Sequence, residues 1–178
     1  MNALSYALLS MLNRKPFSGY DLKKLMELFW QAKHSQIYPL LTKLEKDELL
    51  TFELISQSGK PDKKIYSITD KGVAALKKWI VDEPAAIPVM RDEFLVKLYA
   101  IGLADPETAR RIFEERLIAK KVTIARLQKE INLMEAQKDD SLTDITNKQF
   151  GRYLLYKRKL RLEEEEIEWV HWAISLLP

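Results

Sequence analysis

The sequence predicts a mainly α-helical protein, with an N-terminal winged helix-turn-helix that has a two-stranded wing, followed by a C-terminal region of long helices. Three observations predict this fold class. Residues 3–46 hold three short amphipathic segments, and residues 50–69 hold two strand-like segments around a turn. Beyond residue 88, apolar residues recur in steps of three and four along two long stretches. Three helices, a hairpin and a further helix form the order of a winged helix-turn-helix, and the apolar seams indicate helices that pack along their length.

The composition is that of a folded chain without thiol chemistry. Of the 178 residues, 47% are apolar, 31% are charged and none is cysteine, which excludes disulfides and thiolate metal sites. No apolar run approaches the roughly 20 residues that span a membrane, and we expect no signal peptide. Residues 1–82 hold 13 Lys and Arg against 9 Asp and Glu, whereas residues 83–178 hold 16 against 17. The basic excess permits nucleic-acid binding by the first part.

The first two helices are indicated by apolar spacing and by a capping residue. Residues 3–13 carry apolar side chains at helical spacing and end before Pro16. Ser18 is expected to cap the second helix, and Asp21, three residues later, completes a capping box with a shorter acid. We expect the apolar face of the second helix to consist of Leu22, Leu25, Met26 and Phe29.

The third helix, expected over residues 35–46, is the candidate reading helix. Ser35 is predicted to cap it, with Pro39 near the first turn, where a missing N–H costs least. At roughly 18 Å, such a helix fits the major groove of DNA, although an ordinary surface helix has the same pattern. The expected inner face is Ile37, Leu40, Leu41 and Leu44, and the outer face, without an acid before Glu45, is Gln36, Tyr38, Thr42 and Lys43.

Residues 50–56 and 63–69 are rich in β-branched and aromatic residues and flank a turn-like segment, so they predict a hairpin. Charged tips are common on solvated loops, but a basic hairpin directly after a helix-turn-helix is typical of a DNA-binding wing. A helix over residues 70–81 is expected to follow. The lysines near the tip are Lys60, Lys63 and Lys64, and the inward residues of the helix are expected to be Leu76, Trp79 and Ile80.

The segment 82–88 contains two prolines and no periodicity, so it predicts a boundary between a domain of residues 1–82 and an α-helical domain of residues 83–178. The second domain is expected to contain helices over residues 91–102, over residues 105–136 and from about residue 150 onward. The two long helices have apolar seams that Lys120 and Glu163 interrupt.

The second domain has more apolar surface than one antiparallel pair of helices can cover, which predicts a homodimer. Each buried Leu or Ile contributes roughly 1.5–3 kcal/mol, so a seam left in water would be costly. We expect the dimer interface to include Tyr153, Leu160, Ile167, Val170, Trp172 and Ile174.

Enzymatic chemistry is not indicated. The two histidines, His34 and His171, lie in different parts of the chain, and no group of residues has metal-ligand spacing. The acidic run from Glu163 to Glu166 is interpreted as a solvated helix face with ion pairs. We therefore predict no catalytic residue, no metal and no cofactor. A helical scaffold protein is the alternative class, which would explain the seams but not the basic hairpin.

A series of spaced motifs resembles the PadR family of transcriptional regulators. The segments 29–36, Asp92-Glu93-Phe94 and Phe150-Gly151-x-Tyr153-Leu154 are also similar to the phenolic-acid-responsive regulators of that family. The first resemblance covers residues 1–82. Its motifs are Ser18-Gly-Tyr-Asp21, Ser35-x-Ile37-Tyr38-Pro39-x-Leu41-x-x-Leu44, Lys64-x-Tyr66-x-Ile68-Thr69, and Gly72.

The resemblance implies a dimeric repressor that binds double-stranded DNA at a palindromic operator and releases it on binding a small aromatic effector such as a phenolic acid. An alternative within the family is a multidrug-sensing repressor that holds flat lipophilic compounds between tryptophans at the dimer interface. The resemblance also implies a cytoplasmic, nucleoid-associated bacterial protein without a membrane partner.

Two sets of contact residues follow from these expectations. The polar face and the basic hairpin would contact DNA, and aromatic side chains near the junction of the two domains, with two arginines for a carboxylate, would hold the effector. The expected DNA contacts are Lys33, His34, Ser35, Gln36, Tyr38, Lys43, Lys60, Lys63 and Lys64. The expected effector contacts are Phe29, Trp30, Arg91, Phe94, Arg152, Tyr153 and Tyr156.

Overall fold

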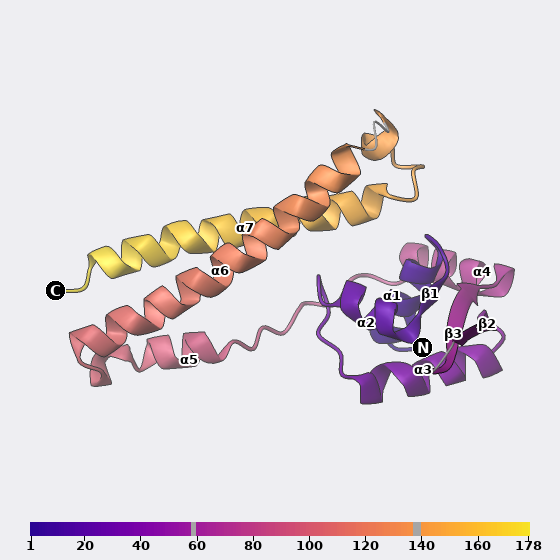
Figure 1. Cartoon of the computed structure of the whole chain (residues 1–178), viewed down its shortest axis with the longest axis horizontal. Coiled ribbons are helices and arrows are strands. Elements are labelled where there is room, and N and C mark those ends of the chain that lie inside the picture. The colour runs from indigo at the N-terminus through magenta and orange to yellow at the C-terminus, as the bar shows by residue number, and fades with distance from the viewer. Residues whose placement is uncertain (58–59, 137–139) are drawn as a thin grey trace. The chain divides into compact units, whose positions relative to one another are not determined.

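The computed structural model describes residues 1–57, 60–136 and 140–178, and it divides into two compact units, Met1–Ala86 and Ile87–Pro178 (Figure 1). We call them the winged-helix unit and the helical unit. The first contains α1 (Ala3–Leu12), β1 (Phe17–Ser18), α2 (Gly19–Met26), α3 (His34–Lys46), β2 (Leu50–Gln57), β3 (Lys60–Ile68) and α4 (Asp70–Asp82). The second contains α5 (Glu93–Tyr99), the 3-10 helices η1 (Ile101–Leu103) and η2 (Asp140–Thr143), and the long helices α6 (Pro106–Glu135) and α7 (Phe150–Ser175).

The predicted fold class is confirmed: the chain is mainly helical, and its first unit is a winged helix-turn-helix. The core of this unit is built from the inner faces of α1, α2 and α3, whose side chains exclude water almost completely. The stacked rings of Tyr6 and Trp79, 4.5 Å apart, fasten α4 to α1. None of the helices in the described residues has the length and apolar character needed to cross a membrane. The most deeply buried side chains of this unit are Leu8, Leu9, Leu22, Met26, Ile37, Leu41 and Leu44.

The sheet of this unit has one strand more than the sequence predicted. Its order is β1-β3-β2, with all neighbours antiparallel. The hairpin of β2 and β3 is the predicted wing, in which Leu50 pairs with Ile68. The additional strand β1 has two residues, and Phe17 pairs with Tyr66. A strand of two residues has no periodicity of its own, so only the pairing partner reveals it.

Several details of the helices differ from the predictions. Helix α3 begins at His34, so Ser35 lies inside the helix and does not cap it, and Pro39 is its sixth residue. Pro39 therefore lies beyond the first turn and cannot donate the usual hydrogen bond to the carbonyl of Ser35. Helix α2 ends at Met26, which places Phe29 in the following loop, and Ile80 of α4 faces solvent rather than the core.

The helical unit is an antiparallel pair of long helices with α5 beside them. Contacts between residues distant in the sequence define the pairing: Arg116 of α6 meets Glu166 of α7, and Glu130 of α6 meets Arg152 of α7. One end of the pair has an apolar cluster to which α5 contributes. The cluster consists of Phe113, Leu117, Val170 and Ala173, with Phe94, Leu98, Ile167, Ile174 and Leu177 packed against it.

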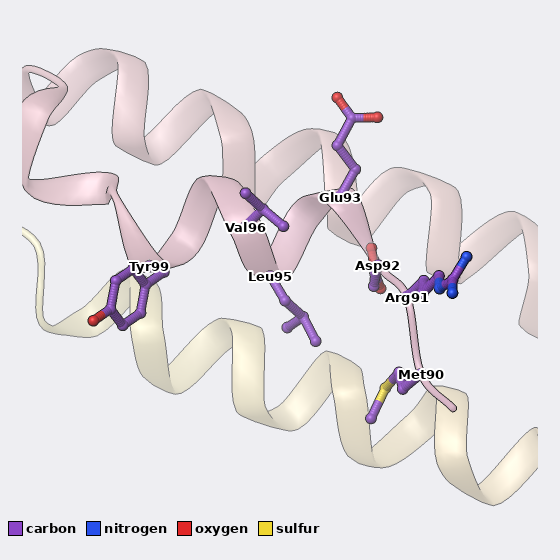
Figure 2. Close-up of a pocket in the computed structure, with 7 residues that line it drawn as sticks. All are labelled: Met90, Arg91, Asp92, Glu93, Leu95, Val96 and Tyr99. Atoms are coloured by element: carbon purple, nitrogen blue, oxygen red, sulfur yellow. The ribbon is translucent and has the colours of Figure 1, made fainter. Parts of the chain in front are cut away.

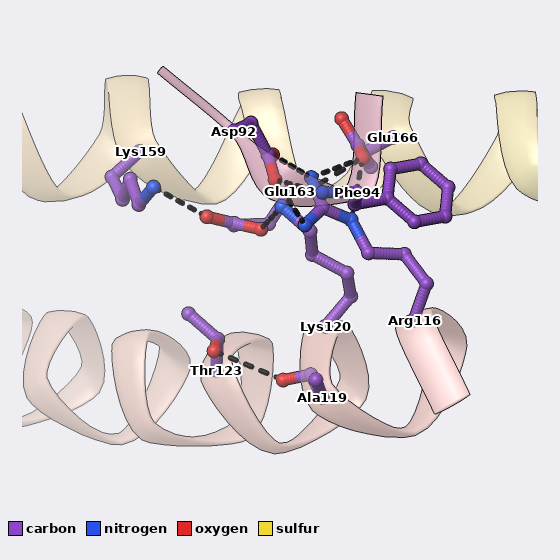
Figure 3. Close-up of polar contacts among 9 residues, drawn as sticks. All are labelled: Asp92, Phe94, Arg116, Ala119, Lys120, Thr123, Lys159, Glu163 and Glu166. Carbon is purple, nitrogen blue, oxygen red and sulfur yellow. Dashed lines mark hydrogen bonds and ion pairs between the residues drawn. The ribbon is translucent and has the colours of Figure 1, made fainter. Parts of the chain in front are cut away.

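The two interruptions of the seams face each other. Lys120 Nζ lies 2.7 Å from Glu163 Oε2, and Lys159 Nζ lies 2.5 Å from Glu163 Oε1 (Figure 3). Glu163 is only 3% exposed, so its interpretation as part of a solvated face is wrong. Burial by itself raises the pKa of a carboxyl group, but the two ammonium groups outweigh it and hold the pKa of Glu163 below its ordinary value. The carboxylate is therefore ionised inside the helix pair at neutral pH.

Gly72 allows the first turn of α4 to lie directly against the backbone before β2. A Cβ atom at this position would lie 2.1 Å from the carbonyl oxygen of Leu49. That carbonyl accepts a hydrogen bond from the N–H of Thr69, the capping residue of α4, at 3.2 Å. The backbone contact leaves no room for a side chain.

We predict that Gly72→Ala destabilises the winged-helix unit by roughly 1–3 kcal/mol, because the added methyl group must displace backbone atoms. Urea unfolding of the full chain, followed by circular dichroism, measures the effect. Gly151→Ala is the matched control, since nothing lies within 4 Å of a Cβ atom there. The control should be neutral or more stable by up to about 1 kcal/mol. Equal stability of the two variants would contradict this explanation of Gly72.

A second prediction concerns the buried carboxylate of Glu163. Lys120→Met should destabilise the helical unit by roughly 1–3 kcal/mol, because Glu163 loses one of its two cations. The double variant Lys120→Met/Glu163→Leu should recover to within about 1 kcal/mol of the wild type, since apolar residues often replace a buried ion pair without loss. Urea unfolding of the three proteins gives the comparison, and a single variant as stable as the wild type would refute it.

Candidate nucleic-acid interface and effector site

Helix α3 presents one buried and one exposed face, as its apolar spacing indicates. Ile37, Leu41 and Leu44 are fully buried in the core, which fixes the rotation of the helix about its axis. The residues between them consequently point to solvent. The exposed set is Lys33, which caps α3, together with His34, Ser35, Gln36, Tyr38, Thr42 and Lys43. This face carries donors and cations, and its first acid is Glu45.

The start of α3 is organised by its own side chains. The amide oxygen of Gln36 accepts a hydrogen bond from the N–H of Lys33 at 2.9 Å, which replaces the cap expected from Ser35. The rings of His34 and Tyr38 are stacked, 5.8 Å apart. Gln36 therefore uses its oxygen in the free protein and keeps its amide nitrogen for other partners.

Gly19 at the start of α2 makes room for Tyr38. A Cβ atom on Gly19 would lie 2.8 Å from Cε1 of the Tyr38 ring. The ring is therefore seated against the first turn of α2, and Ser18 caps that helix by accepting a hydrogen bond from the N–H of Asp21 at 3.2 Å. The structure thus brings Ser18 and Gly19, at the start of α2, next to Tyr38 of α3.

The wing lysines are partly engaged within the unit. Lys63 Nζ lies 3.3 Å from Asp21 Oδ2. Hydrogen bonds from the hydroxyl of Ser18 and from Lys63 hold the pKa of Asp21 below its ordinary value. Lys64 Nζ lies 3.6 Å above the centre of the Phe52 ring and 3.9 Å from Glu45. The side chain of Lys60 lies outside the described residues, as do residues 58–59 of the turn predicted over residues 58–62. Residues 60–62 belong to β3, so the predicted turn is wrong for that part.

The predicted effector residues do not come together within one unit. Phe29 and Trp30 are exposed on the loop after α2, in the winged-helix unit. In the helical unit, Phe94 lies beside Arg116, whereas Arg152 pairs with Glu130 at 2.8 Å. Glu130 is 14 residues beyond Arg116, roughly 21 Å along α6.

At the far end of the helix pair, Arg152 lies over the ring of Tyr156, with 4.8 Å between the guanidinium carbon and the ring centre. The hydroxyl of Tyr153 donates a hydrogen bond to Glu135 at 2.8 Å. These three residues form one group at the start of α7, apart from Phe94 in the same chain.

An aromatic cluster with a cation lies at the α5 end of the helix pair. Phe94 contacts Phe113 and Trp169 edge-on, with ring centres 5.9 and 6.4 Å apart, and Trp169 contacts Trp172 at 6.5 Å. The guanidinium carbon of Arg116 lies 4.4 Å from the centre of the Phe94 ring. The prediction omitted Arg116, although its position three residues after Phe113 places it on the same side of α6.

A shallow hollow runs along α5 next to this cluster. Its volume is about 780 Å³, and Figure 2 shows its lining residues, which extend from the segment before α5 to the last residue of that helix. Among the lining residues, Asp92 and Glu93 contact Arg116 and Lys97, whereas Arg91 has no ion-pair partner in the described part of the chain. The lining comprises Met90, Arg91, Asp92, Glu93, Leu95, Val96 and Tyr99. The hollow combines apolar walls with one available cation.

The predicted dimer interface needs correction. Leu160 and Val170 are buried within the single chain, and Ile167 and Ile174 pack against the apolar cluster of that chain. Leu160 and Val170 are therefore not available to a partner, whereas Ile167 and Ile174 are only half-buried. Tyr153 is half-buried near Glu135, and Trp172 is 57% exposed. The buried seam residues Leu160 and Val170 therefore belong to the contact between α6 and α7 of one chain.

Comparisons with known proteins decide the family. Residues 8–78 match the model of the "Transcriptional regulator PadR-like family", and residues 90–178 match "Virulence activator alpha C-term". The negative transcriptional regulator PadR of Bacillus subtilis is 30% identical, over 99% of this chain and 98% of that protein. The chain belongs to the PadR family of transcriptional regulators. Its relatives in this family are regulators and not enzymes.

Solved structures of PadR from Bacillus subtilis match the whole chain. The complex of that protein with operator DNA has a TM-score of 0.80 at 30% identity, covering 99% of each chain. Its complex with p-coumaric acid has a TM-score of 0.70 at 30% identity, covering 98% of each chain. The PadR-family fold thus extends over both units, including the helical one, where the sequence motifs were sparse.

Proposed function

We propose that this PadR-family protein is a dimeric transcriptional repressor that binds a palindromic operator and releases it when a small aromatic effector binds. The observation that carries the DNA part is the exposed face of α3, which has donors and cations from Lys33 to Lys43 and lies next to the lysine-bearing strand β3. A helix of this size fits the major groove, and lysines neutralise phosphates. The likeness to the operator complex of PadR from Bacillus subtilis supports this proposal.

Each side chain proposed to contact DNA is assigned the DNA group that its chemistry fits. Gln36 reads a base edge through its amide group, Lys33 and Lys43 contact phosphates or base edges, and Tyr38 contacts a phosphate. Lys63 and Lys64 exchange their present carboxylate partners for phosphates. His34, Ser35 and Lys60 complete the proposed contact surface.

We predict that Lys43→Ala weakens binding to all DNA sequences and reduces the slope of log affinity against log salt by about one, because one phosphate contact is lost. Titration of operator and random DNA at several salt concentrations measures both quantities. Lys78→Ala, which removes an exposed lysine from α4, is the matched control and should leave both unchanged. If wild-type protein does not prefer any DNA sequence, the proposed function is wrong.

Gln36 requires a variant that separates its two roles. Gln36→Glu keeps an oxygen to accept the hydrogen bond from the N–H of Lys33, so the helix start is preserved. It removes the amide donor and adds a negative charge, and should therefore change the preferred sequence in a selection from random DNA. An unchanged preference would exclude base contact by Gln36.

The dimer is proposed from the apolar surface that the helical unit leaves in water. Its exposed apolar side chains are grouped on α5, α6 and α7, and grouped apolar residues at a surface mark interaction sites. Sedimentation of the wild-type protein at micromolar concentration tests it, and a monomer would refute it. The exposed apolar residues include Val96, Tyr99 and Leu103 near α5, Ile118 and Val122 on α6, and Leu154, Leu162, Trp172 and Leu176 on α7.

The effector is proposed to be a phenolic acid, as supported by the p-coumaric acid complex of PadR from Bacillus subtilis. Aromatic residues stack on its ring, and an arginine pairs with its carboxylate. Arg91, which has no ion-pair partner in the described residues, and Arg152 are the proposed cations. Two alternative groups within the helical unit are proposed: Phe94 with Arg91 at the α5 end, and Tyr153 and Tyr156 with Arg152 at the start of α7. Phe29 and Trp30 are the proposed contacts on the winged-helix unit.

The alternative effector is a flat lipophilic drug, and the exposed Trp172 beside Trp169 favours it. Quenching of tryptophan fluorescence by p-coumaric acid and by a flat cationic dye, alone and on the operator complex, separates the two. For a phenolic acid, Arg91→Gln or Arg152→Gln should weaken acid binding about tenfold, and the acid should release DNA. For a drug sensor, dye quenching should be lost in Trp172→Phe. Quenching by neither compound would refute both effector classes.

We also propose a cytoplasmic, nucleoid-associated location, which imaging of a fluorescent fusion would test.

A further inference from the structure

The segment that joins the two units, residues 83–91, is a short linker whose side chains are all exposed and which forms no helix or strand. Pro84 and Pro88 fix their own φ angles and hold the preceding residues in an extended conformation. The two prolines thus restrict residues 83, 84, 87 and 88 to extended backbone, which stiffens the linker at these positions. The contacts that fix its two ends therefore also influence its direction.

The N-terminal end of the linker is held by the winged-helix unit. Trp79, in the last turn of α4, stacks on Tyr6 of α1 and so belongs to the core of that unit. The N–H of Glu83, where the linker begins, donates a hydrogen bond to the carbonyl of Trp79 at 3.2 Å. The linker thus begins at the C-terminal end of α4, which the core of the winged-helix unit holds in place.

The C-terminal end of the linker is held by Arg116. Asp92 directly follows the linker, and its Oδ2 and Oδ1 atoms accept from the two terminal nitrogens of Arg116 at 2.6 and 3.5 Å (Figure 3). The Nε–H of Arg116 donates to Glu166 of α7 at 2.8 Å. One guanidinium group of α6 therefore links Asp92, the first residue after the linker, to both long helices.

This contact exceeds what α5 needs for its own structure. Phe94 and Leu98 already pack α5 against the apolar cluster. Asp92 caps the helix by accepting from the N–H of Phe94 at 3.0 Å, and this cap needs no arginine, just as Asp105 caps α6 through Thr108. What Arg116 adds is orientation, because a planar guanidinium that meets both oxygens fixes the angle of the carboxylate.

The Asp92 carboxylate keeps its charge in this contact. Burial raises its pKa, but the hydrogen bonds from Arg116 and from the N–H of Phe94 outweigh this effect and hold the pKa of Asp92 below its ordinary value. The contact is consequently maintained at neutral pH.

We propose that Arg116 is a positioning residue for DNA recognition: by holding Asp92 it sets the direction of the linker, and with it the half-site spacing that a dimer accepts. This inference rests on the proposed function. In a bivalent complex, the second contact depends on the effective concentration of the second module at its site. If the linker direction is fixed, the effective concentration of the second winged-helix unit is high at one half-site spacing and low at others. If the linker direction varies, the effective concentration differs less between spacings. Arg116 thus governs spacing selectivity and leaves the affinity for a single half-site unchanged.

The experiment compares Asp92→Asn with Asp105→Asn in the full chain. Both substitutions keep an oxygen that caps a helix, but only the first removes the carboxylate that Arg116 holds. The DNA is an operator selected by the wild-type protein, the same operator with one or two base pairs inserted between half-sites, and a single half-site. Each inserted base pair shifts one half-site by roughly 3.4 Å and rotates it by about a tenth of a turn.

We expect the ratio of affinities for native and altered spacing to fall on the order of tenfold in Asp92→Asn, with single half-site affinity and sedimentation unchanged. Asp105→Asn should keep the wild-type ratio. A wild-type ratio in Asp92→Asn would overturn the inference while leaving the proposed function intact, whereas a wild-type protein that selects no operator would overturn the proposed function. If Asp92→Asn loses helix content, insertion of two glycines after Ala86 in the wild-type chain replaces it. That insertion should lower the ratio similarly, and an unchanged ratio would overturn the inference.

Discussion

The helical unit depends on the contact between Lys120 and Glu163. Both charges lie where an apolar residue would continue the seam, and the pair is satisfied in only one alignment of α6 against α7. A slip of one turn in one direction would place Lys120 opposite Ile167 and Glu163 opposite Ile124. A slip in the other direction would bring Lys120 toward Lys159. A buried ion pair adds little net stability, but an uncompensated buried charge costs several kcal/mol. The pair therefore selects the register, while the apolar residues supply the stabilisation.

The register also determines which surfaces remain for function. With Lys120 against Glu163, Arg116 lies next to Glu166 and within reach of Asp92 at the start of α5. The same alignment gathers Phe94, Phe113 and Trp169 at one end of the helix pair. Helix α5 and the adjoining faces of the long helices then remain apolar and exposed, which is the physical basis of the proposed dimer and effector surfaces.

The winged-helix unit follows from a different constraint, the complete burial of one face of α3. Since Ile37, Leu41 and Leu44 exclude water, the polar residues between them must point outward as one surface. Two glycines permit the close approach that this arrangement needs. Gly19 leaves room for the ring of Tyr38, and Gly72 lets α4 lie on the backbone at Leu49. The packing that buries the apolar face of α3 thus both stabilises the core and exposes the polar face of this helix.

The sequence by itself determined the order of the helices, the hairpin, the cap at Ser18 and the family, because these depend on local spacing and on residues with narrow conformational preferences. The heptad spacing also identified the apolar face of each long helix. It did not tell whether Leu160 and Val170 face their own chain or a partner, since both situations produce the same periodicity.

Only the tertiary structure decided the contacts between residues far apart in the chain. The two-residue strand β1 is defined by its pairing with β3. The burial of Glu163 and the role of Arg116 depend on which helix lies opposite, and a charged residue in a sequence looks the same whether it is solvated or paired. The start of α3 at His34 was decided by Gln36, whose side chain reaches back to Lys33 and makes a cap at Ser35 unnecessary. Local preferences determine where helices can form, and the free energy of packing and of compensating buried charge determines where they end and what they face.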